Sequence, residues 1–110
     1  MSAGVISLSV DQAAATTATL IAAVSGKKIE VLGFCLAVFG GIGTVKSTLQ
    51  DETSNTVRMT LVGSATVPAV HKYSGGRKLP AFTSGLGEGL ELVTGTAVTI
   101  TGFINYRFII

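Results

Sequence analysis

Apolar and polar residues alternate with a period of two along most of the chain. The alternation is clear in residues 6–10 and 57–61, and it is longest in residues 97–110. Successive side chains of a β-strand point to opposite faces of the sheet, so this period predicts strands with one face turned toward a core. Gly102, in the middle of the longest run, suggests a bulge or a close backbone approach.

Shorter apolar segments between glycine- and serine-rich turns predict the remaining strands: residues 19–24, 27–39, 44–50, 66–70, 79–82 and 90–94. The polar residues 51–55 predict a hairpin tip whose charges are solvated. Residues 10–24 are the one helical candidate, but branched threonines lower their helix propensity, so we expect at most one helical turn at residues 11–15. Strands at this spacing predict an all-β sandwich or a small barrel.

The length and composition indicate one ordered domain. Of the 110 residues, 47% are hydrophobic and 13% are charged, which excludes intrinsic disorder because a disordered chain has low hydrophobicity and high charge. We expect residues 1–24 to form an N-terminal arm with the first strand or strands, and residues 25–110 to form the body of the sandwich. The small charged fraction also suggests that part of the surface does not face water.

Two segments carry more apolar side chains than one small sandwich needs. Residues 32–39 are apolar on both faces of the predicted strand, and the chain ends in the apolar residues 108–110. A strand that is apolar on both faces must be covered twice, and a ring of identical subunits with closed symmetry is the usual way to provide such cover. The predicted subunit interface consists of Leu32, Phe34, Leu36, Val38, Phe108 and Ile110.

The chain lacks the residue clusters that common catalytic and metal sites require. Cys35 is the one cysteine and His71 the one histidine, whereas a structural zinc site needs about four ligands. No Gly-x-Ser-x-Gly motif is present, and neither residues 43–47 nor the glycine-rich residues 85–89 have the spacing of a phosphate-binding loop. We therefore expect no enzymatic activity, no cofactor, no metal ion and no small-molecule substrate.

One stretch of the chain, residues 71–78, is locally basic and contains a tyrosine and an arginine, which are enriched at protein interfaces. The predicted contact with a partner consists of His71, Lys72, Tyr73, Arg77 and Lys78. A solvated loop that keeps the protein soluble is the alternative interpretation. The net charge is only +2 and the other cations are scattered, so the sequence does not indicate a nucleic-acid partner.

Residues 29–45 are largely apolar and are flanked by Lys28 and Lys46. Their length is at the lower limit of the roughly 17–25 residues that a membrane-spanning helix needs. Glu30 and four glycines within the segment favour strands joined by a turn, so we expect no membrane segment. A small membrane-active protein remains an alternative. The N-terminus also lacks the basic region of a secretory signal, which predicts synthesis in the cytoplasm.

Four segments carry a resemblance to a known family: residues 25–32, the Val45-Lys46 pair, residues 87–92 and residues 102–106. Their order resembles small virion proteins of tailed bacteriophages, over most of the chain from Ser25 onward. The resemblance implies an all-β, jelly-roll-like antiparallel β-sandwich and a homotrimer that decorates the capsid exterior, with the major capsid protein as its partner. It thus implies a virion protein made in the host cytoplasm.

A second function is compatible with the same resemblance. Related jelly rolls serve in head fibres and tail tips, so the chain could be a receptor- or glycan-binding module. Binding to sugars by stacking would require exposed aromatic rings, for which Tyr73 and Phe82 are the candidates.

Overall fold

The computed structural model describes residues 4–13, 16–40, 44–64, 69–75, 79–95 and 97–110. These residues form strands joined by turns, without a helix. The strands are β1 (Ile6–Ala13), β2 (Thr17–Ile21), β3 (Lys28–Gly40), β4 (Thr44–Asp51), β5 (Val57–Ser64), β6 (Ala69–Ser74), β7 (Phe82–Thr83), β8 (Leu90–Val93) and β9 (Val98–Ile109).

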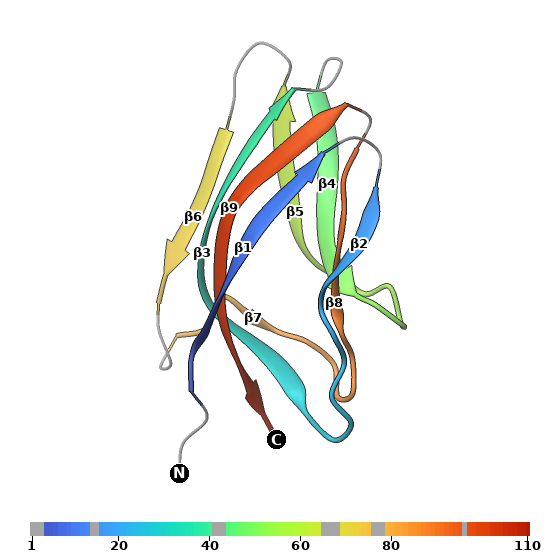
Figure 1. Cartoon of the computed structure of the whole chain (residues 1–110), viewed down its shortest axis with the longest axis vertical. Helices are drawn as coiled ribbons and strands as arrows, with labels where there is room; N and C mark the ends of the chain where they lie inside the picture. Colours follow the sequence, from blue (N-terminus) through green and yellow to red (C-terminus); the bar gives the residue numbers. More distant parts are fainter. Residues whose placement is uncertain (1–3, 14–15, 41–43, 65–68, 76–78, 96) are drawn as a thin grey trace.

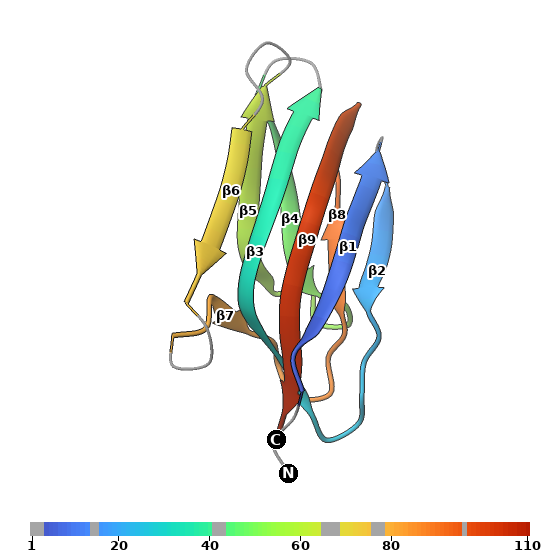
Figure 2. The ribbon, with the colours of Figure 1, turned by 60° about the vertical axis from the view of Figure 1, so that its left-hand side comes forward.

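The strands form two antiparallel sheets that pack face to face (Figure 1). One sheet has the order β1-β9-β3-β6, and the other has the order β2-β8-β4-β5. The short β7 pairs with β3 beyond the end of β6 (Figure 2). Apart from the β4–β5 hairpin, consecutive long strands alternate between the two sheets, which is the strand order of a jelly roll. The structure thus confirms the predicted all-β, jelly-roll-like sandwich.

The first part of the chain is integrated into the sandwich. β1 pairs with β9 from Ile6 to Ala13, and β2 pairs with β8. The helical turn expected at residues 11–15 is wrong for residues 11–13, which continue β1, while residues 14 and 15 lie outside the described residues. The side chain of Gln12 helps to hold the end of β1 in the sandwich, because its Nε2 donates hydrogen bonds to the carbonyl oxygens of Thr16 (3.0 Å) and Leu92 (2.8 Å).

The core lies between the sheets and consists of alternate residues of each strand. The sheet that contains β3 and β9 contributes Leu36, Val38, Ile100 and Ile104, and the opposite sheet contributes Leu49, Leu61, Leu90 and Leu92. Each of these side chains is at most 1% exposed. The period of two seen in the sequence therefore corresponds to the inward face of the strands.

A bulge in β3 changes which of its side chains point to the core, and this change bears on the predicted subunit interface. The pairing of β3 with β9 shifts between Val31 and Gly33, so the inward positions pass from odd to even residue numbers there. The side chains of Phe34, Leu36 and Val38 therefore join this chain's own core, and those of Leu36 and Val38 are at most 1% exposed. The burial of Leu36 and Val38 in this chain's own core contradicts a subunit interface at these two positions, because residue-by-residue alternation does not reveal the bulge. A subunit interface at Phe34, which also lines the hollow described below, stays a prediction.

The hairpin tip between β4 and β5 is only partly solvated. Asp51 is 1% exposed, and it accepts hydrogen bonds from Nε (3.1 Å) and Nη2 (2.7 Å) of Arg58 and from the N–H of Gly85 (3.0 Å). Glu88 accepts hydrogen bonds from the N–H groups of Thr53 and Ser54. The expectation of solvated charges is thus wrong for Asp51, whose carboxylate ties the tip to the loop between β7 and β8.

In the described part of the chain, no helix is long and apolar enough to cross a membrane. Most of the apolar segment considered above, residues 29–40, belongs to β3 at the centre of a sheet.

Candidate interaction surface

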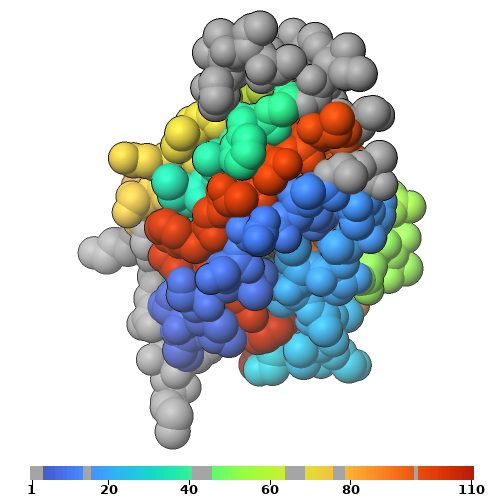
Figure 3. Space-filling view, turned by 45° about the horizontal axis from the view of Figure 1, so that its top comes forward, coloured from blue at the N-terminus to red at the C-terminus, as the bar shows by residue number. Residues whose placement is uncertain are grey.

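The solvent-facing side of the β1-β9-β3-β6 sheet carries an apolar patch. Alternation along β3 turns Cys35, Ala37 and Phe39 outward, and the register places Phe103 of β9 beside Cys35 and Val70 of β6 beside Ala37. Phe39, Phe103 and Val70 are 39%, 42% and 64% exposed. We call these five residues the outer apolar face. Figure 3 shows β1, β9, β3 and β6 lying side by side on this side of the molecule.

The outer side of the opposite sheet is more polar. Nε2 of Gln50 donates a hydrogen bond to a carboxylate oxygen of Glu91 (2.6 Å), and the hydroxyl of Thr48 donates one to the amide oxygen of Gln50 (2.9 Å). Exposed apolar side chains on this sheet, Val57 and Val62, lie on the edge strand β5. The two sheets thus differ in their outer sides, and the patch with exposed phenylalanines lies on only one of them.

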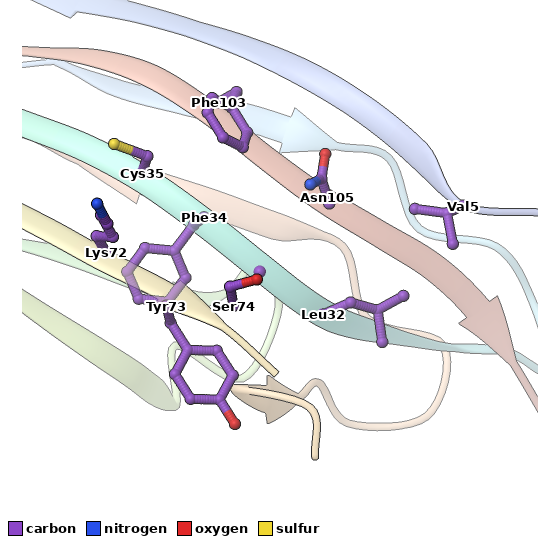
Figure 4. A pocket seen from close by; sticks show the side chains of 10 residues that line it. Val5, Leu32, Phe34, Cys35, Lys72, Tyr73, Ser74, Phe103 and Asn105 are labelled. Atoms are coloured by element: carbon purple, nitrogen blue, oxygen red, sulfur yellow. The ribbon is translucent and has the colours of Figure 1, made fainter. Parts of the chain in front are cut away.

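The outer apolar face continues into a hollow of about 440 Å³. Val5, Leu32, Phe34, Cys35, Tyr73 and Phe103 supply most of its apolar lining, and Lys72, Ser74 and Asn105 supply polar groups (Figure 4). The rings of Phe34 and Tyr73 stack with their centres 6.3 Å apart, and the Tyr73 hydroxyl donates a hydrogen bond to the carbonyl of Leu79 (2.6 Å). Phe34 belongs to the core and Tyr73 packs against it, so these contacts hold β3 and β6 together beside the hollow.

The structure brings only part of the predicted partner contact together. His71, Lys72 and Tyr73 lie in β6, while Arg77 and Lys78 lie outside the described residues. Lys72 is exposed beside the hollow, and the imidazole of His71 turns to the edge of β5, where its Nε2 lies 3.0 Å from the Val62 carbonyl oxygen. The sequence analysis placed Lys72 and Tyr73 in a loop, whereas they lie in β6. Their contact with a partner stays a prediction.

The other residues of the predicted subunit interface lie in different places. Leu32 is 4% exposed and lines the hollow. Phe108 packs against the core, and Ile110 is 94% exposed. The sequence analysis did not single out the outward side chains of Phe39 and Phe103. The signal for Phe39 is the change of alternation that follows Val31 in β3, and the signal for Phe103 is the unbroken alternation of residues 97–110.

Carboxylates in the described residues are largely occupied by contacts within the chain. Glu30 pairs with Arg107 (2.7 Å), and Asp51 pairs with Arg58 (2.7 Å). Burial raises the pKa of Asp51, but the hydrogen bonds from Arg58 and Gly85, together with the Arg58 charge, outweigh this effect and hold the pKa below its usual value.

The described lysines, unlike the carboxylates of Glu30 and Asp51, have no ionic partner within the described part of the chain. Within the described residues, the ion pairs involve the arginines at positions 58 and 107 and none of the lysines at positions 27, 28, 46 and 72. The same residues contain no group of three or more His, Cys, Asp or Glu side chains that could hold a metal ion.

Comparisons with known proteins show similarity at the level of the fold. No protein-family model and no curated protein sequence matches the chain. A solved structure described as "Bacillus endospore appendages form a novel family of disulfide-linked pili" is 15% identical, with a TM-score of 0.51, and the alignment covers 98% of this chain and 89% of that chain.

Two structures of infectious bursal disease virus also align with most of the chain. The T=1 particle structure is 14% identical (TM-score 0.34), and the Gt strain structure is 15% identical (TM-score 0.32). Each alignment covers 97% of this chain, which spans about two fifths of the viral chains. At such identities, the comparisons show only that this chain shares its fold with the pilus structure.

Proposed function

We propose that this protein is a non-enzymatic structural component of a bacteriophage virion, which binds the outer surface of the capsid as a homotrimer and stabilises the shell. The observation that carries the proposal is the outer apolar face, which is exposed in the single chain. Phage origin and the major capsid protein as partner rest on the resemblance of residues 25–110 to tailed-phage virion proteins. The fold shared with the pilus protein is compatible with a subunit of an assembly.

Covering the exposed aromatic side chains of the outer apolar face with a neighbouring subunit would be favourable, because it removes apolar area from water. A fully buried phenylalanine removes 150–250 Å² from water. Covering the exposed 42% of Phe103 therefore removes roughly 80 Å², which is worth about 2 kcal/mol. Three such contacts closing one ring, and three subunits binding a symmetric shell together, would add avidity without any chemical step.

Light scattering coupled to size-exclusion chromatography tests the oligomer. We expect a mass three times that of the 11.2 kDa chain. Phe103→Ser should shift the protein toward monomer while its circular dichroism stays unchanged, because this side chain is outside the core. Val57→Ser is the matched control, since Val57 is 50% exposed on the opposite sheet. A wild-type monomer at tens of micromolar would contradict the proposal.

Capsid binding is tested by adding the purified protein to phage particles that lack it. We expect co-sedimentation with the particles and an increase in their resistance to heat or chelation, because a ligand that binds only the assembled shell stabilises it by mass action. Lack of binding to intact particles would contradict the capsid role and leave the fibre or tail-tip role.

The glycan-binding alternative has weaker structural support. The ring of Tyr73 stacks on Phe34 and its hydroxyl is hydrogen-bonded, while Phe82 packs against the core. Neither ring is a free platform for a sugar. Specific binding on a glycan array by the oligomer would nevertheless favour this alternative over the capsid role.

A further inference from the structure

We propose that copies of this chain join edge to edge, with β1 of one copy pairing antiparallel with β6 of the next and extending the sheet that carries the outer apolar face. This inference rests on the homo-oligomer proposed above and specifies how its subunits join. The partner of each edge is a second copy of this chain. A contact between two different patches of the same protein generates a ring when the rotation between neighbours closes.

The β1-β9-β3-β6 sheet ends in two strands that each have a free edge (Figure 2). Within the described residues, β1 pairs with β9 alone and β6 pairs with β3 alone. A free edge exposes backbone N–H and C=O groups that can pair with a further strand. β1 pairs without a register shift over Ile6–Ala13 and contains no proline, lysine or arginine, so it lacks the common devices against edge pairing.

The directions of the two edge strands suit this pairing. Neighbouring strands in the sheet are antiparallel, so β1 and β6, which are separated by β9 and β3, run in opposite directions. A rotation about an axis parallel to the strands keeps the direction of every strand, and it therefore brings β1 of one copy beside an oppositely directed β6 of the next. Three copies about such an axis can turn their outer apolar faces inward, which covers Phe103 of each copy.

The two edges carry exposed charges of opposite sign, Asp11 on β1 and Lys72 on β6. Lys72 pairs with Cys35 of the outer apolar face, so its side chain lies on that side of the sheet. Asp11 pairs with Thr101, which lies opposite Ala37 of the same face. Neither charge has an ion-pair partner in the described part of the chain. Opposite charges on two surfaces favour their association and oppose other partners.

Asp11 and Lys72 cannot meet within one chain, because β9 and β3 lie between their strands. Neighbouring strands lie about 4.8 Å apart, so the two edges of the sheet are separated by roughly 14 Å. Antiparallel pairing of β1 with β6 of the next copy can place Asp11 directly opposite Lys72, where opposite charges stabilise a sheet. The same register places Ser9 opposite Ser74, so that exposed residues lie opposite exposed residues.

The edges of the opposite sheet are less suited to pairing. β2 has only five residues, and its pairing with β8 shifts register between Thr19 and Ile21. At the edge of β5, Nε2 of His71 lies 3.3 Å from the Val62 nitrogen and 3.0 Å from the Val62 carbonyl oxygen. The imidazole thus occupies backbone groups that an added strand would need. These differences favour the sheet of β1 and β6 as the one that is extended.

Disulfide trapping tests the register in the full-length protein, in a Cys35→Ser background that removes the chain's one cysteine. Ser9→Cys with Ser74→Cys places one thiol on each edge. Under mild oxidation, we expect covalent dimers and trimers on a non-reducing gel, because directly opposite residues lie within disulfide range and the two edges of one chain do not. Ser9→Cys with Val57→Cys, on β5 of the opposite sheet, is the matched control and should not give trimers. Equal trapping of both pairs, or of neither, would overturn the proposal.

A charge exchange tests the same contact without thiols. Asp11→Lys or Lys72→Asp alone should weaken association roughly fivefold in light scattering at low salt, because like charges then lie opposite each other. The variant with both substitutions should associate within about twofold of wild type, since the pair is attractive again. Asp11→Lys with Lys46→Asp, at an exposed lysine of β4, has the same net charge and should stay weak. Failure of the exchanged pair to restore association would overturn the pairing of Asp11 with Lys72.

The outcomes separate this inference from the proposed function. A wild-type trimer that binds capsids but shows no trapping between Ser9→Cys and Ser74→Cys would overturn the edge pairing alone. A wild-type monomer would overturn both. Trapping that continues into a ladder of species larger than trimers would support the edge pairing and overturn the closed trimer.

Discussion

Asp51 offers a sharp test of how the sandwich holds the β4–β5 hairpin tip and the loop between β7 and β8. Its carboxylate is 1% exposed and joins the end of β4 to Arg58 and to the N–H of Gly85. The Gly85 contact also anchors the loop that carries Leu86. Replacing Asp51 should therefore lower the stability of the domain and loosen this loop.

The loss of folding free energy depends on which groups lose their partner when Asp51 is replaced. Breaking a buried ion pair by removing one partner costs roughly 3–5 kcal/mol, but the Arg58 side chain is 29% exposed and regains water. We therefore expect Asp51→Ala to cost about 3 kcal/mol, and Asp51→Asn about 2 kcal/mol because the amide oxygen still accepts a hydrogen bond from Gly85. For a domain of this size, the melting temperature falls by roughly 4 °C per kcal/mol.

Thermal and urea denaturation monitored by circular dichroism measure these losses, with Lys46→Gln on the exposed side of β4 as the control. Because folding lowers the pKa of Asp51, its stabilisation is fully present above the unfolded pKa, near 3.8, and is lost as the pH falls through the folded value. The gap between wild type and Asp51→Asn should therefore close in acid. A loss below about 0.5 kcal/mol at pH 7, the range of ordinary surface substitutions, would refute this reasoning.

Substitutions at Gly102, Gly26 and Gln12 test the backbone and the side-chain hydrogen bonds of the sandwich. Gly102 has a φ of +144°, and a Cβ there would lie 1.9 Å from the carbonyl oxygen of Cys35, so Gly102→Ala should abolish soluble folding. Gly26→Ala, at a positive φ with open space, should cost only about 1 kcal/mol by urea denaturation. Gln12→Leu removes the hydrogen bond to the Leu92 carbonyl and should cost about 1–3 kcal/mol in the same assay, whereas a neutral result would contradict a structural role for Gln12.

Sequence patterns predicted the strands well where alternation was unbroken. β5 and β9 were recognised because their inward residues recur at every second position, as in the buried Ile100 and Ile104. β3 was harder, because the bulge after Val31 shifts the inward face by one residue. A segment that the sequence pattern predicts to be apolar on both faces can thus be a strand whose core-facing positions shift by one residue at a bulge.

The candidate surface could be predicted only in part. Local composition drew attention to Lys72 and Tyr73, which line the hollow, but the hollow also requires Leu32 and Phe103, which are far apart in the sequence. The burial of Asp51 was missed for the same reason, because its partner Gly85 lies 34 residues away. Local patterns reveal which face of a strand is apolar, whereas such sites depend on register between distant strands.

A cryo-electron microscopy map of capsids carrying this protein tests the central claim most directly. We predict trimeric rings of jelly rolls on the outer surface of the shell, with Phe103 of each copy covered by its neighbour. Isolated jelly rolls whose Phe103 side faces solvent, or a map without the protein on the shell, would contradict the account.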